Sequence, residues 1–382
     1  MNIIQRIIPF FFFTLIFLSF YFLNYQQVYS GSYESDTSEH IIILKQYFSG
    51  EKYIPHPLWH YCVYYISKIL TISIENAAVL FSSILMFTWV VIIFNYVKLQ
   101  LHNHVSIQYQ YYLYILFSFV ILFIGPLVIP GDYIIYLGKG SPNIWHNITI
   151  FMVKPIAFLT LIFMMQAWKT DNRKYYFITY FFAILTLFAK PSFLIIFLPT
   201  IVIVAVINKV YSKNFIMYVL LLSVTSVSIL LYQFVNTFGT TEVIFDYLGV
   251  WSRTSQNIGL SIALGLAFPL LFTIIRSEIL YEKLFQIAWI QVLLGVLFYA
   301  FLAQSGKQYL HGNFSWSYMI AMNFIYIFTI VRFIKDFFSI GKIGRILLSF
   351  LLFLQVSIGV YYFNKILMGQ HPIYISISFL RL

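Results

Sequence analysis

The sequence has little charge and almost no cysteine. Only 9% of its 382 residues are charged and 61% are hydrophobic, whereas soluble domains are about 25% charged and roughly 45–50% apolar. A water-soluble domain of this size could not bury so much apolar surface. The composition excludes a soluble enzyme, a nucleic-acid-binding protein and a disordered scaffold. It predicts an all-α polytopic transmembrane helical bundle, with residues 1–382 forming a single transmembrane domain.

The single cysteine, Cys62, excludes an intrachain disulfide, a Cys-based zinc site and an iron–sulfur cluster. No other part of the sequence has the spacing of a strong metal template, so we expect neither a metal nor a cofactor. The net charge of +11 is typical of Lys and Arg retained in cytoplasmic loops.

Long apolar runs predict about eleven membrane-spanning helices, because a span needs roughly 20 apolar residues. The first run follows the basic Arg6 and is too long for a signal peptide. Residues 57–70 form a shorter apolar run and predict an interfacial helix on the membrane surface. The predicted spans are 7–24, 77–97, 110–130, 149–168, 175–189, 191–208, 215–236, 258–275, 284–303, 316–334 and 346–363.

Loop charges predict the orientation of these spans. One set of loops carries most of the Lys and Arg, and the opposite set carries most of the acids. The positive-inside rule then places the N-terminus in the cytoplasm of a plasma membrane protein. Residues 25–76 become the longest extracytoplasmic loop. Six of the eight histidines fall on this outer side, so we expect the functional site to be extracytoplasmic.

The first outer loop contains the best candidates for a general base. Glu34, Asp36, Glu39 and His40 lie within seven residues, and such a cluster can supply a base and a group that orients it. Asp36 is the preferred base and Glu34 the second choice. A solvated acidic loop is the simpler alternative. The same loop supplies candidate substrate-binding residues, which are His40, His56, Trp59 and His60.

Three basic residues are candidates for binding a phosphate. Lys154 and Lys190 each precede a proline near the predicted outer end of a span, and an ionisable residue inside the membrane is a functional hypothesis by default. Both prolines are expected to bend or interrupt their helices. Arg253, beside Trp251, is the third candidate. The alternative for the lysines is snorkelling to lipid headgroups.

Two further outer segments combine histidine, asparagine and tryptophan, a set that suits carbohydrate. Amide and imidazole groups hydrogen-bond hydroxyls, and an aromatic face packs on a sugar ring. An interfacial aromatic belt is the alternative for the tryptophans. The candidate residues are Asn143, Trp145, His146 and Asn147 in the first segment, and His311, Asn313 and Trp316 in the second.

The pattern resembles the GT-C class of integral membrane glycosyltransferases. The resemblance rests on Glu34-Ser35-Asp36 after the first span, on the 57–70 helix, and on the run from Ser141 through Lys154-Pro155 to Lys190-Pro191. It implies transfer of a sugar from a polyprenyl-phosphate-linked donor, such as an undecaprenyl phosphate, to a lipid-linked glycan acceptor. Asp36 would then be the base, and Lys154, Lys190 and Arg253 would stabilise the leaving phosphate. The process implied is surface polysaccharide biosynthesis, of O-antigen or capsule.

Alternatives remain open. A Wzy-type repeat-unit polymerase acts at the same face and has a similar composition. A lipid or polysaccharide transporter should show repeat halves and polar residues at the midplane, and the sequence shows neither. A membrane O-acyltransferase and a non-enzymatic assembly subunit complete the set. Convergence of Asp36, Lys154 and Lys190 on one cavity would favour the transferase.

Overall fold

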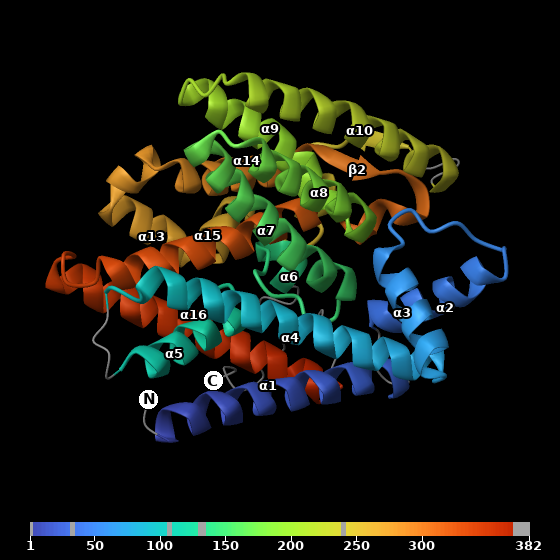
Figure 1. The fold of residues 1–382 in the computed structure, drawn as a ribbon, viewed down its shortest axis with the longest axis horizontal. Coiled ribbons are helices and arrows are strands. Elements are labelled where there is room, and N and C mark those ends of the chain that lie inside the picture. Colours follow the sequence, from blue (N-terminus) through green and yellow to red (C-terminus); the bar gives the residue numbers. More distant parts are fainter. Residues whose placement is uncertain (1–2, 31–34, 105–108, 129–134, 238–241, 370–382) are drawn as a thin grey trace.

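A computed structural model describes residues 3–30, 35–104, 109–128, 135–237 and 242–369. In these ranges the protein is a helical bundle, as predicted, and it also has one short pair of strands, which was not predicted (Figure 1). The helices α2 and α3 lie together at one end of the bundle, at the right in Figure 1, and α1 and α10 form opposite sides. The elements are α1 (Ile3–Tyr29), α2 (Asp36–Phe48), α3 (Leu58–Leu70), α4 (Ile74–Leu101), α5 (Gln110–Phe123), α6 (Ile135–Lys139), α7 (Ile148–Thr170), α8 (Arg173–Ala189), α9 (Ser192–Ile207), α10 (Lys213–Thr237), β1 (Val243–Phe245), α11 (Gly249–Ser252), α12 (Ile258–Gly265), α13 (Ala267–Ile275), η1 (Ser277–Tyr281), α14 (Lys283–Phe301), β2 (Leu302–Gln304), η2 (Gly306–His311), α15 (Ser315–Lys335) and α16 (Lys342–Leu367).

Within the described part of the chain, seven helices are long and apolar enough to cross a membrane, or eight if α12 and α13 form one bent span. Every predicted span coincides with a helix, but α5 and α9 are shorter apolar helices and α8 has 17 residues. The sequence therefore predicts a helix wherever it predicts a span, but eleven full-length spans are more than the helix lengths supply, and 258–275 contains two helices rather than one.

The helix predicted over 110–130 ends early, at Phe123. The break precedes Gly125-Pro126, and a residue before proline is disfavoured in the helical region. The chain then passes against α16, where Gly125 N donates to Gln355 O at 3.0 Å. Gly359 permits this crossing, because a Cβ there would lie 1.7 Å from Phe123 O.

The helix predicted over 258–275 is broken into α12 and α13, which meet at an angle of 73°. The carbonyls freed by the bend are occupied. Leu264 O accepts from Leu127 N at 3.2 Å, and Gly265 O accepts from the Tyr326 hydroxyl at 2.6 Å. Buried backbone groups in a membrane need such partners, so these contacts stabilise the bend.

The first predicted loop is largely helical. Ser35 caps α2, and its hydroxyl accepts from Thr37 N at 3.1 Å. Helix α3 matches the predicted 57–70 helix and turns Trp59, His60 and other residues inward. The Trp59 indole donates to Ser82 Oγ on α4 at 3.2 Å. This end of the bundle therefore consists of two packed helices rather than a solvated loop.

Candidate functional site

Asp36 occupies the first turn of α2, where several side chains fix the start of the helix. The hydroxyls of Ser35 and Thr37 both donate to Gln27 Oε1 at 3.0 Å. Gln27, on α1, donates from Nε2 to Trp145 O at 2.8 Å. These bonds join α1, α2 and the segment before α7. The backbone around Asp36 is consequently held on both sides.

A directed chain of hydrogen bonds connects Asp36 to Lys190. Asn147 caps α7, with its Oδ1 accepting from Ile150 N at 3.1 Å and from the Thr149 hydroxyl at 2.8 Å. Its Nδ2 therefore faces the carboxylate and donates to Asp36 Oδ2 at 2.5 Å. Lys190 Nζ completes the chain by donating to Thr149 Oγ1 at 2.9 Å. Oδ2 is held as an acceptor, so Oδ1 is the carboxylate oxygen left for chemistry.

The break between α8 and α9 positions Lys190. Ala189 ends α8, Lys190 is extended, and Pro191 is the N-cap of α9, which begins at Ser192, so the predicted interruption at Pro191 is confirmed. The Lys190 ammonium lies 4.6 Å from the centre of the Trp316 ring, a favourable cation–π geometry. Tyr136 is stacked on the same tryptophan, with ring centres 6.2 Å apart. Trp316 therefore contacts the ammonium, and Tyr136 packs against that tryptophan.

Burial shifts the pKa values of Asp36 and Lys190, at the two ends of this hydrogen-bond chain, toward neutral pH. It raises the pKa of Asp36 to about 6, and the charge of Lys190 partly opposes that rise while Glu39 adds to it. Burial likewise lowers the pKa of Lys190 to about 8, against the charge of Asp36. A carboxylate and an ammonium therefore coexist near pH 7, each close to its titration point, as is common in active sites.

Three histidines lie beside this pair. His40 Nδ1 and His60 Nε2 are 3.2 Å apart, and the His40 ring also contacts Trp59. Burial, followed by the neighbouring histidines and Lys190, holds the pKa of His40 well below its usual range. Burial and Lys190 lower the pKa of His56 to about 3. The structure therefore brings His40, His56 and His60 together with Asp36 and Lys190.

Lys154 belongs to a different network. It is fully buried on α7, and its ammonium donates to Pro142 O at 2.7 Å and to Asn143 Oδ1 at 3.2 Å. Asn143 donates in turn to Ile121 O at 3.1 Å, and Asn323 Nδ2 donates to Pro142 O at 3.1 Å. Lys154 and Asn143 thus brace the segment before α7. Pro155 does not interrupt α7.

Trp145 and His146 are packed within the protein. The Trp145 ring is 1% exposed and lies among four phenylalanines, including Phe20 at 5.7 Å and Phe363 at 4.8 Å between ring centres. His146 Nδ1 lies 3.2 Å from the Tyr362 hydroxyl, and its ring contacts Tyr136. In this structure both rings lie in interior packing rather than on an open sugar platform.

The remaining predicted residues are more peripheral. Arg253 and His311 are exposed. Asn313 donates to Gln304 Oε1 and accepts from the Trp316 indole at 3.3 Å, so it orients the ring that faces Lys190. Glu34 lies outside the described residues. Of the three predicted phosphate-binding residues, Lys190 is the one whose hydrogen bonds connect it to Asp36.

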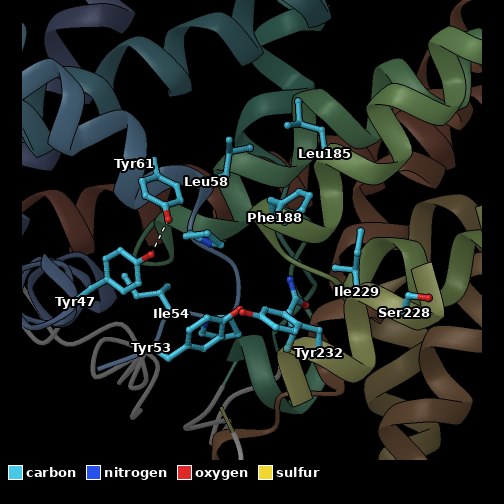
Figure 2. Close-up of a pocket in the computed structure, with 13 residues that line it drawn as sticks. Tyr47, Tyr53, Ile54, Leu58, Tyr61, Leu185, Phe188, Ser228, Ile229 and Tyr232 are labelled. Carbon is cyan, nitrogen blue, oxygen red and sulfur yellow. Dashed lines mark hydrogen bonds between the residues drawn. The ribbon is translucent and has the colours of Figure 1, made fainter. Parts of the chain in front are cut away.

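An apolar cavity of about 580 Å³ lies between α2, the segment before α3, α3, α8 and α10 (Figure 2), within the roughly 300–1,000 Å³ typical of ligand pockets. Pro55 and Pro57, which flank His56, contribute to its wall, and so does Phe188, two residues before Lys190. Figure 2 shows the hydroxyls of Tyr47 and Tyr61 meeting at its edge, 2.6 Å apart. The full lining is Tyr47, Tyr53, Ile54, Pro55, Pro57, Leu58, Tyr61, Leu185, Phe188, Ser228, Ile229, Tyr232 and Gln233.

Sequence reasoning missed Gln27, Thr149 and Tyr136. Gln27 had a visible signal, since it is a polar residue at the end of an apolar run, whereas the contacts of Thr149 and Tyr136 are purely tertiary. Among the described residues, no three His, Cys, Asp or Glu side chains are arranged to hold a metal ion. No protein-family model matches the chain, no curated protein matches it, and no solved structure matches it.

Proposed function

We propose that this protein is an integral membrane glycosyltransferase that moves a sugar from a polyprenyl-phosphate-linked donor to a lipid-linked glycan acceptor. The observation that carries the proposal is the pairing of Asp36 with Lys190 through Asn147 and Thr149. It provides a base and a cation at fixed positions in one site. Glycosyl transfer to a hydroxyl requires both, one for the nucleophile and one for the leaving phosphate.

The proposed chemistry follows from the free oxygen of Asp36. The acceptor hydroxyl gives its proton to Asp36 Oδ1, because Oδ2 already accepts from Asn147. The acceptor oxygen forms a bond to the anomeric carbon as the bond from that carbon to the phosphate oxygen breaks. The electron pair leaves with the phosphate, and the Lys190 ammonium stabilises the charge that develops there.

The apolar cavity supports a lipid-linked substrate. One of its walls is formed by α10, whose apolar side chains are widely exposed. Leu231 is 59% exposed and Tyr232, which lines the cavity, is 61% exposed. In a membrane this surface faces lipid. A chain entering from the lipid would therefore bring its phosphate toward His56 and Lys190.

The experiment that tests the proposal compares Asp36→Asn with wild type at matched expression. Lipid-linked and surface glycans are measured by mass spectrometry. Glu51→Gln is the matched control, because Glu51 is an exposed carboxylate in the segment after α2. We expect Asp36→Asn to lose one sugar residue from the glycan while the control keeps it.

Two other outcomes are informative. Collapse of long chains to single repeat units would assign the same site to a repeat-unit polymerase. A glycan profile that is unchanged both in Asp36→Asn and in a deletion of the whole protein would overturn the glycosyltransferase proposal.

A further inference from the structure

Hydrogen bonds join the ends of several helices at the C-terminal end of α7. In the connection from α7 to α8, Asp171 O accepts from Asn214 Nδ2 at 2.9 Å, and Asp171 Oδ1 accepts from the Ser212 hydroxyl at 2.6 Å. Asn208, at the end of α9, donates to Gln286 Oε1 in the first turn of α14 at 2.6 Å. The ends of α7, α8, α9, α10 and α14 therefore form one continuous surface.

This surface is strongly basic. It carries six cations, which we call the basic rim. They are Lys169, Arg173, Lys174, Lys209, Lys213 and Lys283. Lys283 is partly buried and the other five are exposed. Among the described residues, no ion pair joins any of the six to an acid. The acid within the rim is Asp171, and its carboxylate accepts from a serine hydroxyl.

Basic residues next to the rim are neutralised instead. Arg332 pairs with Glu282 at 2.8 Å and with Asp336 at 2.7 Å, and Arg276 pairs with Asp336 at 3.3 Å. Glu282 directly precedes Lys283 in the sequence, yet its ion pair is with Arg332. The same end of the protein thus has a paired half and an unpaired half. Because clustered like charges repel each other, a bound anion would stabilise the unpaired half.

We propose that the basic rim binds the headgroup of an anionic phospholipid, with the acyl chains lying along α9 and α10. This site is separate from the one that contains Asp36. Asn147, which contacts Asp36, is at the N-terminal end of α7, and the rim is at its C-terminal end. A helix of 23 residues is about 34 Å long. The phospholipid is therefore not the proposed sugar donor.

The surface beside the rim favours a lipid over a soluble anion. Helix α10 begins at the rim and lies on the outside of the bundle beside α9 (Figure 1). Its first turns expose Met217, Leu220 and Val224, and the last turn of α9 exposes Val206. In a membrane this apolar surface faces lipid. A phospholipid matches both the basic rim and the apolar helices, whereas a soluble phosphate matches the rim alone.

Trp168 provides an independent observation at the same place. Its side chain is 9% exposed, and its indole Nε1 has no hydrogen-bond partner among the described residues. The Lys283 ammonium lies 5.9 Å from the centre of its ring, and the Phe215 ring of α10 lies at the same distance. An indole N–H is a donor only, and a buried donor without a partner is costly. A phosphate oxygen or a headgroup hydroxyl beside Lys283 would accept from it.

The test measures lipid binding without turnover, so its result does not depend on the transferase proposal. The purified full-length protein is freed of lipid in detergent and titrated in native mass spectrometry. The ligands are dioleoyl-phosphatidylglycerol, dioleoyl-phosphatidylcholine and sn-glycerol 3-phosphate. The rim variant is Lys169→Gln/Lys213→Gln. The matched control is Lys52→Gln/Lys68→Gln, which removes the same charge from exposed lysines at the α2–α3 end.

We expect wild type and the control to hold one phosphatidylglycerol at least about tenfold more tightly than phosphatidylcholine. Each Lys or Arg near a membrane surface strengthens the binding of anionic lipid by about fivefold. The rim variant should therefore lose roughly tenfold or more in affinity for phosphatidylglycerol. Its affinity for phosphatidylcholine should stay within about twofold of wild type, because that headgroup has no net charge.

Three results would overturn the inference. Equal affinity of the wild type for the two lipids would show that the protein does not select the headgroup charge. An equal loss in the rim variant and the control would assign the selectivity to net charge rather than to the rim. Binding of sn-glycerol 3-phosphate as tight as that of phosphatidylglycerol would make the rim a site for a soluble phosphate.

Discussion

If the protein catalyses the proposed sugar transfer, the pKa values at the two ends of the Asp36–Lys190 chain predict a bell-shaped dependence of its rate on pH. The base must be a carboxylate and the cation an ammonium, and their pKa values are about 6 and about 8. About 80% of the molecules then carry both forms at pH 7, but only about one tenth at pH 5 or pH 9. The rate should therefore fall by about ninefold on either side.

Lys190→Arg separates the two limbs. A guanidinium stays charged throughout this range, so the variant should keep the acid limb near pH 6 and lose the basic one. Its rate at pH 9 should equal or exceed its rate at pH 7, whatever the absolute rate. The acid limb should not move far, because the positive charge that opposes the rise in the pKa of Asp36 is retained.

The assay follows endogenous lipid-linked glycans by mass spectrometry in membrane vesicles incubated between pH 5 and pH 9. Lys45→Arg is the matched control. Lys45 lies on α2, pairs with Glu75 at 2.6 Å and is about half exposed. The Lys45→Arg variant should keep the bell-shaped pH dependence of the wild-type rate. A basic limb near pH 8 that survives in Lys190→Arg would refute the reasoning, because the titrating group would then be another residue.

Three further variants test the surroundings of the site. Asp36→Asn should stabilise the folded protein at pH 8, because it removes a carboxyl group whose pKa burial raises to about 6. The gain in unfolding free energy is up to about 3 kcal/mol, and it should appear as a higher thermal midpoint. The gain should fade as the pH drops from 6 toward 4, because the cost of the raised pKa is full above the folded-state value of about 6 and vanishes below the ordinary value of 3.8. Tryptophan fluorescence in detergent measures this. Asn147→Asp should move the acid limb of the rate profile upward by about one pH unit or more, since a second carboxylate disfavours ionisation of Asp36. Lys154→Met should reduce the yield of monodisperse protein and leave the rate per folded molecule unchanged, because Pro142 O and Asn143 Oδ1 each lose the bond from the ammonium and keep only the one from Asn323, and a hydrogen bond to a charged group contributes about 1.5–3 kcal/mol.

Much of the fold could be predicted from hydropathy because each helix is a local property of the chain. The errors fall where local signals compete. The sequence from Ser35 to Phe48 carries a capping serine, acids in its first turn and Lys45 in its last turn, which together predict a helix. Its acidic start instead suggested a loop. At α5 the apolar run continues past Gly125-Pro126, but the helix ends at Phe123.

The site was predictable in its residue types but not in its pairings. Lys154 and Lys190 are equivalent in sequence, since each precedes a proline near the end of a helix. In the structure they differ, because Lys154 donates a hydrogen bond to the Pro142 carbonyl and Lys190 donates one to the Thr149 hydroxyl. Asn147 lies 111 residues from Asp36 in sequence. Contacts of this kind depend on how α2 and α7 pack, which no local pattern encodes.

The breaks in α5 and in α12–α13 bear on the choice between a transferase and a transporter. Discontinuous helices are frequent in transporters, where they form the substrate site near the bilayer midplane and one bundle moves against the other around it. Here the freed groups are bonded to neighbouring helices, as Gly125 is to Gln355 and Gly265 is to Tyr326. Moving these segments would expose buried backbone groups at a cost of several kcal/mol each. The buried groups whose pKa values are shifted, Asp36, Lys190 and the three histidines, gather instead at the α2–α3 end. A rigid bundle with its chemistry at one end suits a fixed reaction site better than alternating access.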